Sequence, residues 1–437
     1  MKRIPSGRCV WGFSLSSECS GLHTRLAALL CGVLLAVLTP AASQAQEPAA
    51  APTLLLIGID GLRWDIIDRH PAPVLQALAA GGVRAQGLVP VMPSKTFPNF
   101  YAIATGLYPE NNGVLDNATH DVVLDMTFRM SQQDDARWFE GEPIWITAER
   151  QGVPTATMFW VGSGVEIHGL RPRYWHPFDG DVSNADRVAQ VLDWFALPEQ
   201  QRPRFVSVYF EAIDSASHEF GVDSPQERTA VAEVDAWIGE LLEGLRASGQ
   251  RENLNVIVVG DHGMSNLDAE RIVYLDDHVD LAALESLYSP QLSGERQGNA
   301  VFAAWHGEPA QVETLYQALA LAHPALRVYR REQFPDWFHQ DHPQRAPDLI
   351  LMPELGWMVS KRGVPYTGPR ANHGFSPQER DMHAAFIASG PAFSASHVVE
   401  PFELVHLYNL MARVLEIEPA PNDGDPARIL PLLAPGR

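Results

Sequence analysis

Six aspartate and histidine side chains lie close in sequence to the ends of predicted strands, where buried sheets bind ligands. Five follow shortly after an apolar run typical of a strand, and the sixth precedes such a run. In chain order they are Asp60, Asp214, His218, Asp261, His262 and His373. Because open parallel sheets bind ligands just beyond the carboxyl ends of their strands, we expect these side chains to converge. Three carboxylates and three imidazoles make two three-ligand sets of the kind that Zn²⁺ accepts.

Taken singly, each of these residues has an ordinary explanation. An Asp after a strand is usually a turn former or a helix cap, and a lone His is usually hydrogen-bonded rather than a ligand. Thr96, at the head of a predicted helix that runs on from Phe100, strengthens the metal interpretation. A Thr hydroxyl is a poor nucleophile unless a base or a metal lowers its pKa. Two metal ions can do so and also clamp both oxygens of a displacement at phosphorus.

Apolar periodicity predicts the elements that must position these residues. Continuous apolar, β-rich runs, typical of strands covered on both faces, lie at residues 54–59, 156–160, 205–210, 256–259, 349–352 and 384–388. The clearest helix begins at Ser224-Pro225 with Glu227 completing a capping box, and it stops near Gly249. A last helix is predicted at about 402–415. Strands alternating with helices predict an α/β fold with a doubly wound, mostly parallel sheet.

Residues 1–45 are predicted to be a secretory signal peptide. A basic segment precedes an apolar run at residues 26–38, which is too short to span a bilayer, and small residues follow at 41–46. Cleavage after Ala45 would remove every cysteine of the chain, so disulfides are not expected to brace the exported protein. The predicted location is the bacterial periplasm or the outside of the cell.

The remaining residues, 46–437, are predicted to form a single catalytic domain. Within it, the segment from about 275 to 365 has a weaker β/α rhythm and is predicted to be an inserted subdomain. The 46% share of hydrophobic residues is that of a packed globular protein. The formal net charge of −21 argues against a protein that coats nucleic acid, because a polyanion requires a basic surface. No membrane anchor and no protein partner is evident.

Ordered motifs extend from about residue 54 to 424. The main ones are Asp60-Gly61, Lys95-Thr96-Phe97-Pro98-Asn99, Thr105-Gly106-Leu107-Tyr108-Pro109-Glu110, Asp214 with His218, Gly260-Asp261-His262-Gly263-Met264 and Asn372-His373-Gly374. In this order they resemble the nucleotide pyrophosphatase/phosphodiesterase family of the alkaline phosphatase superfamily. The resemblance implies an alkaline-phosphatase-like fold and two Zn²⁺ per chain.

The resemblance also assigns the site residues. It implies one zinc on Asp214, His218 and His373, and the other on Asp60, Asp261 and His262. Thr96 would be the nucleophile and contact the second zinc, and Asn117 would hydrogen-bond a phosphoryl oxygen. Phe97 and Tyr209 match an aromatic pair that sandwiches a nucleobase. Tyr174, Trp175 and Phe178 are further pocket candidates, of which we take Tyr174 as substrate-binding.

These assignments predict hydrolysis of the phosphodiester and pyrophosphate bonds of nucleotides through a covalent phospho-Thr intermediate. Charge favours a diester, because two Zn²⁺ and three ionised Asp leave a single net positive charge, which the alkoxide of Thr96 neutralises. A monoester would bring a further negative charge. Alternatives within the superfamily are a monoester phosphatase or phosphonate hydrolase, and a phosphodiesterase of lysophospholipids or choline esters. A binder of metal or nucleotide without turnover is the alternative of another class.

Overall fold

An eight-stranded sheet forms the centre of the computed structural model, which describes residues 51–280, 288–290, 292, 299–364, 366 and 368–436. In spatial order its strands are β18 (His397–Val399), β2 (Val83–Ala85), β17 (Phe386–Ser389), β9 (Leu254–Val259), β1 (Thr53–Ile59), β8 (Phe205–Phe210), β6 (Thr155–Met158) and β7 (Tyr174–His176). β17 is antiparallel to its neighbours β9 and β2, and the other pairs are parallel. The predicted α/β class with a mostly parallel sheet is confirmed.

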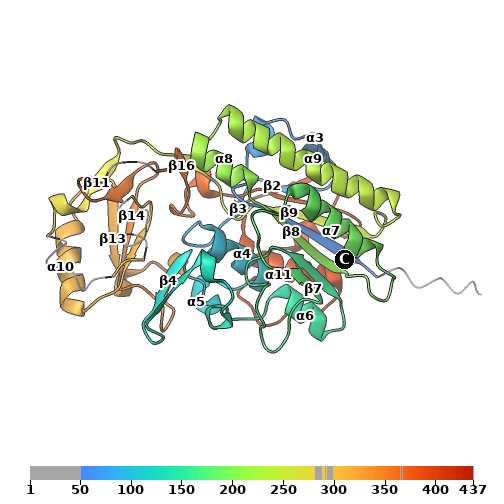
Figure 1. Cartoon of the computed structure of the whole chain (residues 1–437), viewed down its shortest axis with the longest axis horizontal. Helices are drawn as coiled ribbons and strands as arrows, with labels where there is room; N and C mark the ends of the chain where they lie inside the picture. Colours follow the sequence, from blue (N-terminus) through green and yellow to red (C-terminus); the bar gives the residue numbers. More distant parts are fainter. Residues whose placement is uncertain are drawn as a thin grey trace, which may run out of the picture. The chain divides into compact units, whose positions relative to one another are not determined.

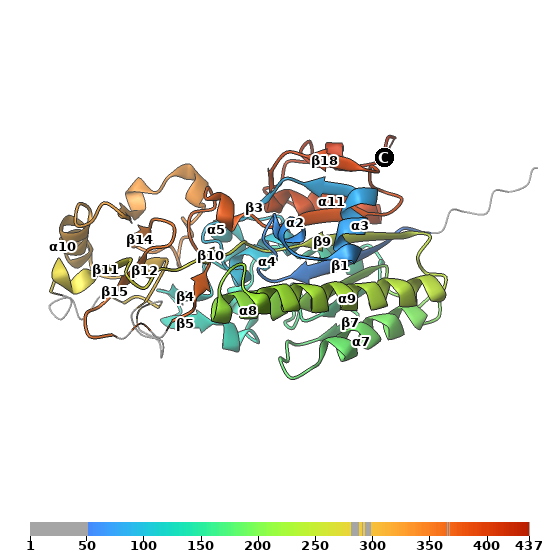
Figure 2. The same ribbon diagram turned by 90° about the horizontal axis from the view of Figure 1, so that it is seen from above.

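Helices cover both faces of this sheet (Figures 1 and 2). One face packs against α3 (Pro73–Gly81), α7 (Asn184–Ala196), α8 (Ala212–Phe220) and α9 (Pro225–Ala247), and the other against α4 (Thr96–Thr105), α6 (Ile144–Arg150) and α11 (Leu407–Leu415). Along β1, Leu54 and Leu56 enter the core of the second face, whereas Leu55 and Ile57 enter the core of the first. This period of two buries every side chain of a central strand, which explains its uninterrupted apolar sequence.

Smaller elements surround the sheet. They are α2 (Ile66–Arg69), α5 (Pro109–Asn112), the pair β3 (Leu88–Val89) and β19 (Phe402–Glu403), the hairpin β4 (Ala118–Asp121) and β5 (Met126–Arg129), and the pair β10 (Ser265–Asn266) and β16 (Ala371–Asn372). The hairpin and the β10–β16 pair adjoin two predicted site residues, because Asn117 precedes the one and His373 follows the other.

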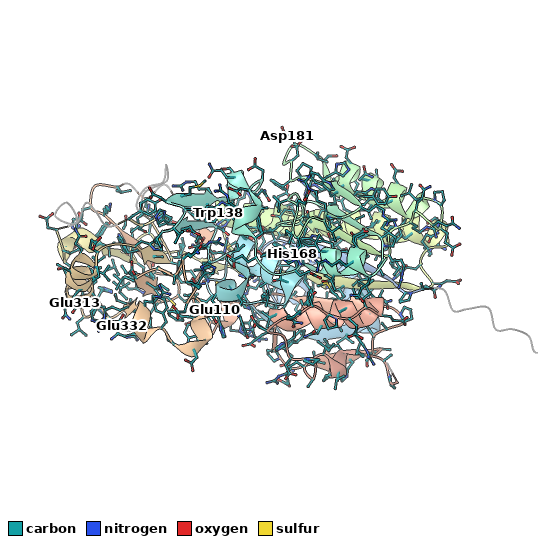
Figure 3. All side chains as sticks on the ribbon, turned by 90° about the horizontal axis from the view of Figure 1, so that it is seen from below. Glu110, Trp138, His168, Asp181, Glu313 and Glu332 are labelled. Atoms are coloured by element: carbon teal, nitrogen blue, oxygen red, sulfur yellow. The ribbon has the colours of Figure 1, made fainter. Side chains whose placement is uncertain are left out.

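The region between β10 and β16 has separate small sheets. They are β11 (Ile272–Tyr274) with β15 (Met358–Ser360), and β12 (Ala303–Trp305), β13 (Leu326–Arg330) and β14 (Leu349–Pro353), next to α10 (Pro309–Leu319). Leu315, Leu319 and Leu351 belong to a hydrophobic cluster confined to this region. Figure 3 labels Glu313 and Glu332 here, and His168 and Asp181 in the part built around the central sheet. A separate core supports the predicted insertion at about 275–365, which stays a prediction.

Two predicted elements differ from the structure. The run at residues 349–352 forms β14 as predicted, but β14 lies between β12 and β13 in an antiparallel sheet outside the central one. Apolar content reveals that a strand is buried and does not reveal which strands it pairs with. The helix predicted at about 402–415 begins only at Leu407, because Phe402–Glu403 pairs with β3 and a 3₁₀ turn, Leu404–His406, follows.

The predicted signal peptide at residues 1–45 lies outside the described residues, as do residues 46–50 of the predicted catalytic domain. Residues Ala50–Arg437 form one compact unit. Among the helices that the structure describes, none is both long enough and apolar enough to cross a membrane.

The start of α3 takes its cap from another helix. Its own N-cap residue, Ala72, has no side-chain acceptor. Asp235 of α9 supplies it instead, because its two carboxylate oxygens accept the amides of Val74 and Leu75 at 3.1 and 2.8 Å. A buried carboxylate that satisfies two free amides also opposes the positive end of the helix dipole.

Asp235→Asn is therefore expected to destabilise the fold. The amide keeps one acceptor oxygen and turns a donor toward the second N–H, so the free energy of unfolding should fall by about 1–2 kcal/mol. Urea denaturation followed by circular dichroism measures this loss, with Glu233→Gln, an exposed acid on the same helix, as the control. Equal midpoints for the two variants would show that Asp235 does not cap α3.

Candidate metal centre and nucleophile

Three neighbouring strands deliver the aspartates to one edge of the sheet. Asp60 follows β1 directly, and its amide donates to the carbonyl of Phe210 at the end of β8 at 2.9 Å. Asp261 comes two residues after β9, and Asp214 lies in the first turn of α8, just after β8. Since β9, β1 and β8 are adjacent and parallel, their carboxyl ends bring the three carboxylates together.

The segment around β16 completes the group from the other side. His218, one helical turn after Asp214, donates from Nδ1 to the carbonyl of Ala371 at 2.8 Å. The carbonyl of His218 in turn accepts the amide of Arg370 at 2.7 Å. Two residues beyond Ala371, the Nε2 atom of His373 lies 3.1 Å from Nε2 of His218.

Glycines next to the ligands allow this close approach. Gly61 has φ +67°, and a Cβ there would lie 3.0 Å from the Cα of Asp214, so any side chain would push α8 away from the end of β1. Its amide donates to Oδ1 of Asp261 at 3.1 Å. A Cβ at Gly263 would lie 1.9 Å from the carbonyl oxygen of Asp381. The Asp-Gly and Asp-His-Gly motifs therefore require glycine, because no larger residue fits at these two positions.

The six side chains form two overlapping groups. In one, Oδ1 of Asp214 lies 3.4 Å from Nε2 of His218 and 3.6 Å from Nε2 of His373. In the other, Nε2 of His262 lies 3.4 Å from Oδ1 of Asp60 and 3.0 Å from Oδ2 of Asp261. His262 is also within ligand distance of Asp214 and His373, and its ring stacks on that of His373 with centroids 3.6 Å apart. The structure thus brings all six predicted ligands together.

Hydrogen bonds orient the three imidazoles alike. Nδ1 of His218 faces the carbonyl of Ala371, Nδ1 of His262 that of Gly263 at 2.9 Å, and Nδ1 of His373 that of Ser94 at 3.0 Å. A carbonyl only accepts, so we assign the proton to Nδ1, which leaves the lone pair of each Nε2 directed into the group. Histidines that bind metals are held in this way.

The carboxylates lack partners on the same side. Oδ1 of Asp60, Oδ1 of Asp214 and Oδ2 of Asp261 are buried and accept no hydrogen bond from the described residues. Burial, with repulsion from Asp261 and Asp214, raises the pKa of Asp60 well above its ordinary value. Although burial lowers the pKa of His262, Asp261, Asp214 and the carbonyl of Gly263 together raise it by more, so the net shift is upward. Lone pairs therefore face lone pairs, an arrangement that a cation would stabilise.

Thr96 lies beside this group. It is the first residue of α4, and its Oγ1 lies 3.4 Å from Nε2 of His262. The positive end of the dipole of α4 makes this an electropositive position. Asn117 lies close by, because its Oδ1 accepts the amide of Phe97 at 2.9 Å, which leaves the side-chain NH₂ as a donor.

Lys95, one of the few lysines of the chain, precedes Thr96 and makes an ion pair. Its Nζ lies 2.8 and 3.0 Å from the two oxygens of Asp116, and 5.0 Å from the centre of the Phe302 ring. The amide of Asn117 donates to the same carboxylate at 2.6 Å. The Lys95–Asp116 pair therefore ties the start of α4 to the segment that carries Asn117.

Of the predicted aromatic pair, Tyr209 has a second contact that its sequence position did not reveal. Its hydroxyl donates to Oδ2 of Asp60 at 2.6 Å, on the opposite oxygen from the one that faces His262. Its ring lies between Phe100, at 5.3 Å, and Phe178, at 5.9 Å. Phe178 is 44% exposed. It is therefore the pocket candidate that lies both next to Tyr209 and at the solvent-accessible surface. Phe97 is buried against Phe128.

Tyr174, selected above as a substrate-binding residue, contacts a different part of the fold. Its hydroxyl donates to the carbonyl of Gln201, in the segment that leads into β8, and its ring stacks on Trp194 of α7. The side chain is thus directed toward the amino ends of the strands, opposite the metal groups. Trp175 packs under the guanidinium of Arg171.

Sequence reasoning missed Arg187 of α7. This buried side chain donates to the carbonyl of Tyr209 at 3.0 Å and pairs through both terminal nitrogens with Glu211, the residue before α8. It therefore holds the end of β8, from which both Tyr209 and Asp214 are presented. A charged residue next to Val188 and Val191 on an apolar helix face was the signal for it.

Known proteins resemble the chain over most of its length. An uncharacterized pyrophosphatase/phosphodiesterase of Schizosaccharomyces pombe is 33% identical over 87% of this chain and 80% of its own length. Ectonucleotide pyrophosphatase/phosphodiesterase family member 3 of Rattus norvegicus is 31% identical over 88% of this chain, which spans only 45% of that protein. The solved structure of murine ectonucleotide pyrophosphatase/phosphodiesterase 5, an inactive threonine-to-alanine variant in complex with AMP, has a TM-score of 0.81 at 30% identity and covers 88% of this chain and 100% of its own.

The fold of these relatives is the alkaline-phosphatase-like fold that the motifs implied. The sequence model of type I phosphodiesterase/nucleotide pyrophosphatase matches residues 54–376, from the strand before Asp60 to just beyond His373. The chain therefore belongs to the type I phosphodiesterase/nucleotide pyrophosphatase family of hydrolases.

Proposed function

We propose that the protein hydrolyses phosphodiester and pyrophosphate bonds of nucleotides, with two zinc ions and a covalent intermediate on Thr96. The observation that carries the proposal is the position of Oγ1 of Thr96, 3.4 Å from Nε2 of His262, a member of one ligand set that also lies close to Asp214 and His373 of the other. A hydroxyl at that point lies at the start of α4 and beside an imidazole whose Nε2 is itself 3.0 Å from the unpartnered Oδ2 of Asp261.

The donor atoms suit zinc. Asp214, His218 and His373 would hold one ion, and Asp60, Asp261 and His262 the other. Each set joins imidazole nitrogen to carboxylate oxygen and leaves room for a fourth ligand, as catalytic zinc sites do. When bound, the ions would lower the pKa of the Thr96 hydroxyl and of water and offset the charge of the phosphoryl group.

The chain's own residues supply the rest of the reaction. Oγ1 of Thr96 forms a bond to phosphorus while the bond to the leaving oxygen breaks, which releases an alcohol or pyrophosphate. Water then attacks the phospho-Thr, and the nucleoside monophosphate departs as Oγ1 regains its proton. The NH₂ of Asn117 would donate to a phosphoryl oxygen, and the positive end of the dipole of α4 would favour the negative charge there.

Aromatic residues beside the centre support a nucleotide substrate. We infer that a base lies against Phe97 and Tyr209, with the exposed ring of Phe178 extending the same surface. The murine relative binds AMP and is inactive as a threonine-to-alanine variant, which agrees with a threonine nucleophile and a nucleoside monophosphate product. The apolar run at residues 26–38 and the ectoenzyme names of the relatives support work after export, in the periplasm or outside the cell.

Thr96→Ala is expected to abolish turnover without loss of metal. Removal of the attacking oxygen should lower kcat on bis-nitrophenyl phosphate by roughly 10³-fold or more. Metal analysis by mass spectrometry should still find close to two zinc ions per chain, and Thr96→Ser should keep measurable activity. Zinc-loaded Thr96→Ala protein that still turns over would refute the covalent mechanism.

Tyr209→Phe separates two roles of one side chain. The variant keeps the ring and loses only the hydroxyl that donates to Asp60. If that bond orients the carboxylate, kcat should fall roughly 10- to 100-fold by the same factor on ATP and on bis-nitrophenyl phosphate. Unchanged rates on both substrates, with Tyr209→Ala impaired on ATP alone, would leave base stacking as the sole role.

A further inference from the structure

A buried carboxylate lies outside the site, at the start of α9. Glu227 is 2% exposed, and its amide donates to Oγ of Ser224, which is one half of the predicted capping box. The other half differs, because the carboxylate does not return to the amide of Ser224. Its oxygens instead accept hydrogen bonds from Ser217 Oγ at 2.9 Å, His70 Nε2 at 2.8 Å, Arg69 at 3.0 Å and the amide of Asp223 at 2.7 Å.

His70, Asp223 and Glu227 lie close enough together to hold a metal ion. A guanidinium already supplies the positive charge, since Nη2 of Arg69 lies 3.0 Å from Oδ1 of Asp223 and 3.0 Å from Oε2 of Glu227. The group is therefore an ion-paired cluster in which Glu227 is the common acceptor. A buried charge with this many donors is tightly fixed in position.

The partners of Glu227 come from the two segments that carry opposite halves of the metal centre. Arg69 and His70 end α2, which follows Asp60 within a few residues. Ser217 is on α8, between Asp214 and His218 in sequence, and faces α9 while those two ligands face the centre. α8 and α9 lie side by side in both views of the fold (Figures 1 and 2).

Hydrogen bonds between β1 and β8 position Asp60 and the end of β8, shortly before α8 begins. The carbonyl of Ala371 and the amide of Arg370 hold His218 from the side of β16, and Ser217 ties the same turn of α8 to Glu227 of α9 on the other side. Glu227 joins this serine to the end of α2 through a single carboxylate. The link spans the same two segments that meet at Gly61 and Asp214.

We propose that Glu227 is a positioning residue, which fixes α8 against α2 and so sets Asp214 and His218 at ligand distance from His373. The proposal rests on the metal centre of the proposed function. Glu227→Gln should loosen it, because the amide keeps the bond from Ser217 but turns a donor toward the donors of Arg69, His70 and Asp223.

The test compares Glu227→Gln with Asp235→Asn. Both residues are buried carboxylates of α9 at 2% exposure, but Asp235 caps α3, away from the metal ligands. Zinc affinity is measured by titrating metal-free protein against a chromogenic chelator. Glu227→Gln is expected to raise the dissociation constant of one of the two zinc sites roughly 10-fold or more and to lower kcat with little change in KM. Asp235→Asn is expected to bind zinc like the wild type even where it is equally destabilised.

Ser217→Ala provides a second variant, which removes only the bond to α8 and keeps the ion pairs of Glu227. It is expected to weaken the same zinc site, and it decides the matter if Glu227→Gln does not fold. Wild-type zinc affinity in both variants, or equal losses in Asp235→Asn, would overturn the proposal. The zinc affinity is measured without turnover, so this test does not depend on the proposed reaction. If the proposed reaction is wrong, the wild-type protein will bind zinc and leave the diester intact.

Discussion

Repulsion among three buried carboxylates is the constraint on which the rest of this structure depends. Asp60, Asp214 and Asp261 meet where three parallel strands end, and each has one oxygen that accepts no hydrogen bond from the described residues. The free energy cost of that arrangement is offset only by positive charge placed among them. The lone pairs of the three Nε2 atoms face these carboxylates in two sets, so two metal ions would satisfy both sets of ligands.

Successive layers of the surrounding fold hold the side chains of this centre in position. Backbone carbonyls hold Nδ1 of each histidine, and the hydroxyl of Tyr209 holds the outer oxygen of Asp60. Beyond them, Arg187 holds the end of β8 and Glu227 joins α2 to α8. Thr96 is presented at 3.4 Å from His262 by the first turn of α4, a helix buried over nearly its whole length. The proposed nucleophile is therefore held on a rigid element and would need little rearrangement to reach phosphorus.

Sequence patterns predicted the features that depend only on neighbouring residues along the chain. Asp60 and Asp261 follow strands whose continuous apolar runs are hard to misread, so their place at one edge of the sheet could be predicted. Partners across long sequence distances could not, because no local pattern encodes them. Residues 349–352 were predicted to be a central strand and lie in another sheet, and Tyr174 is directed to the opposite end of its strand. Glu227 matched a capping box, yet its carboxylate binds residues from α2 and α8.

The most direct test of the account is anomalous X-ray diffraction at the zinc absorption edge, on crystals of the protein loaded with zinc. Two peaks are expected, one bounded by Asp214, His218 and His373 and the other by Asp60, Asp261 and His262. Each should lie about 2.0–2.1 Å from Nε2 of its histidines. A single peak, or zinc bound away from these six side chains, would contradict the two-metal centre on which the proposed reaction rests.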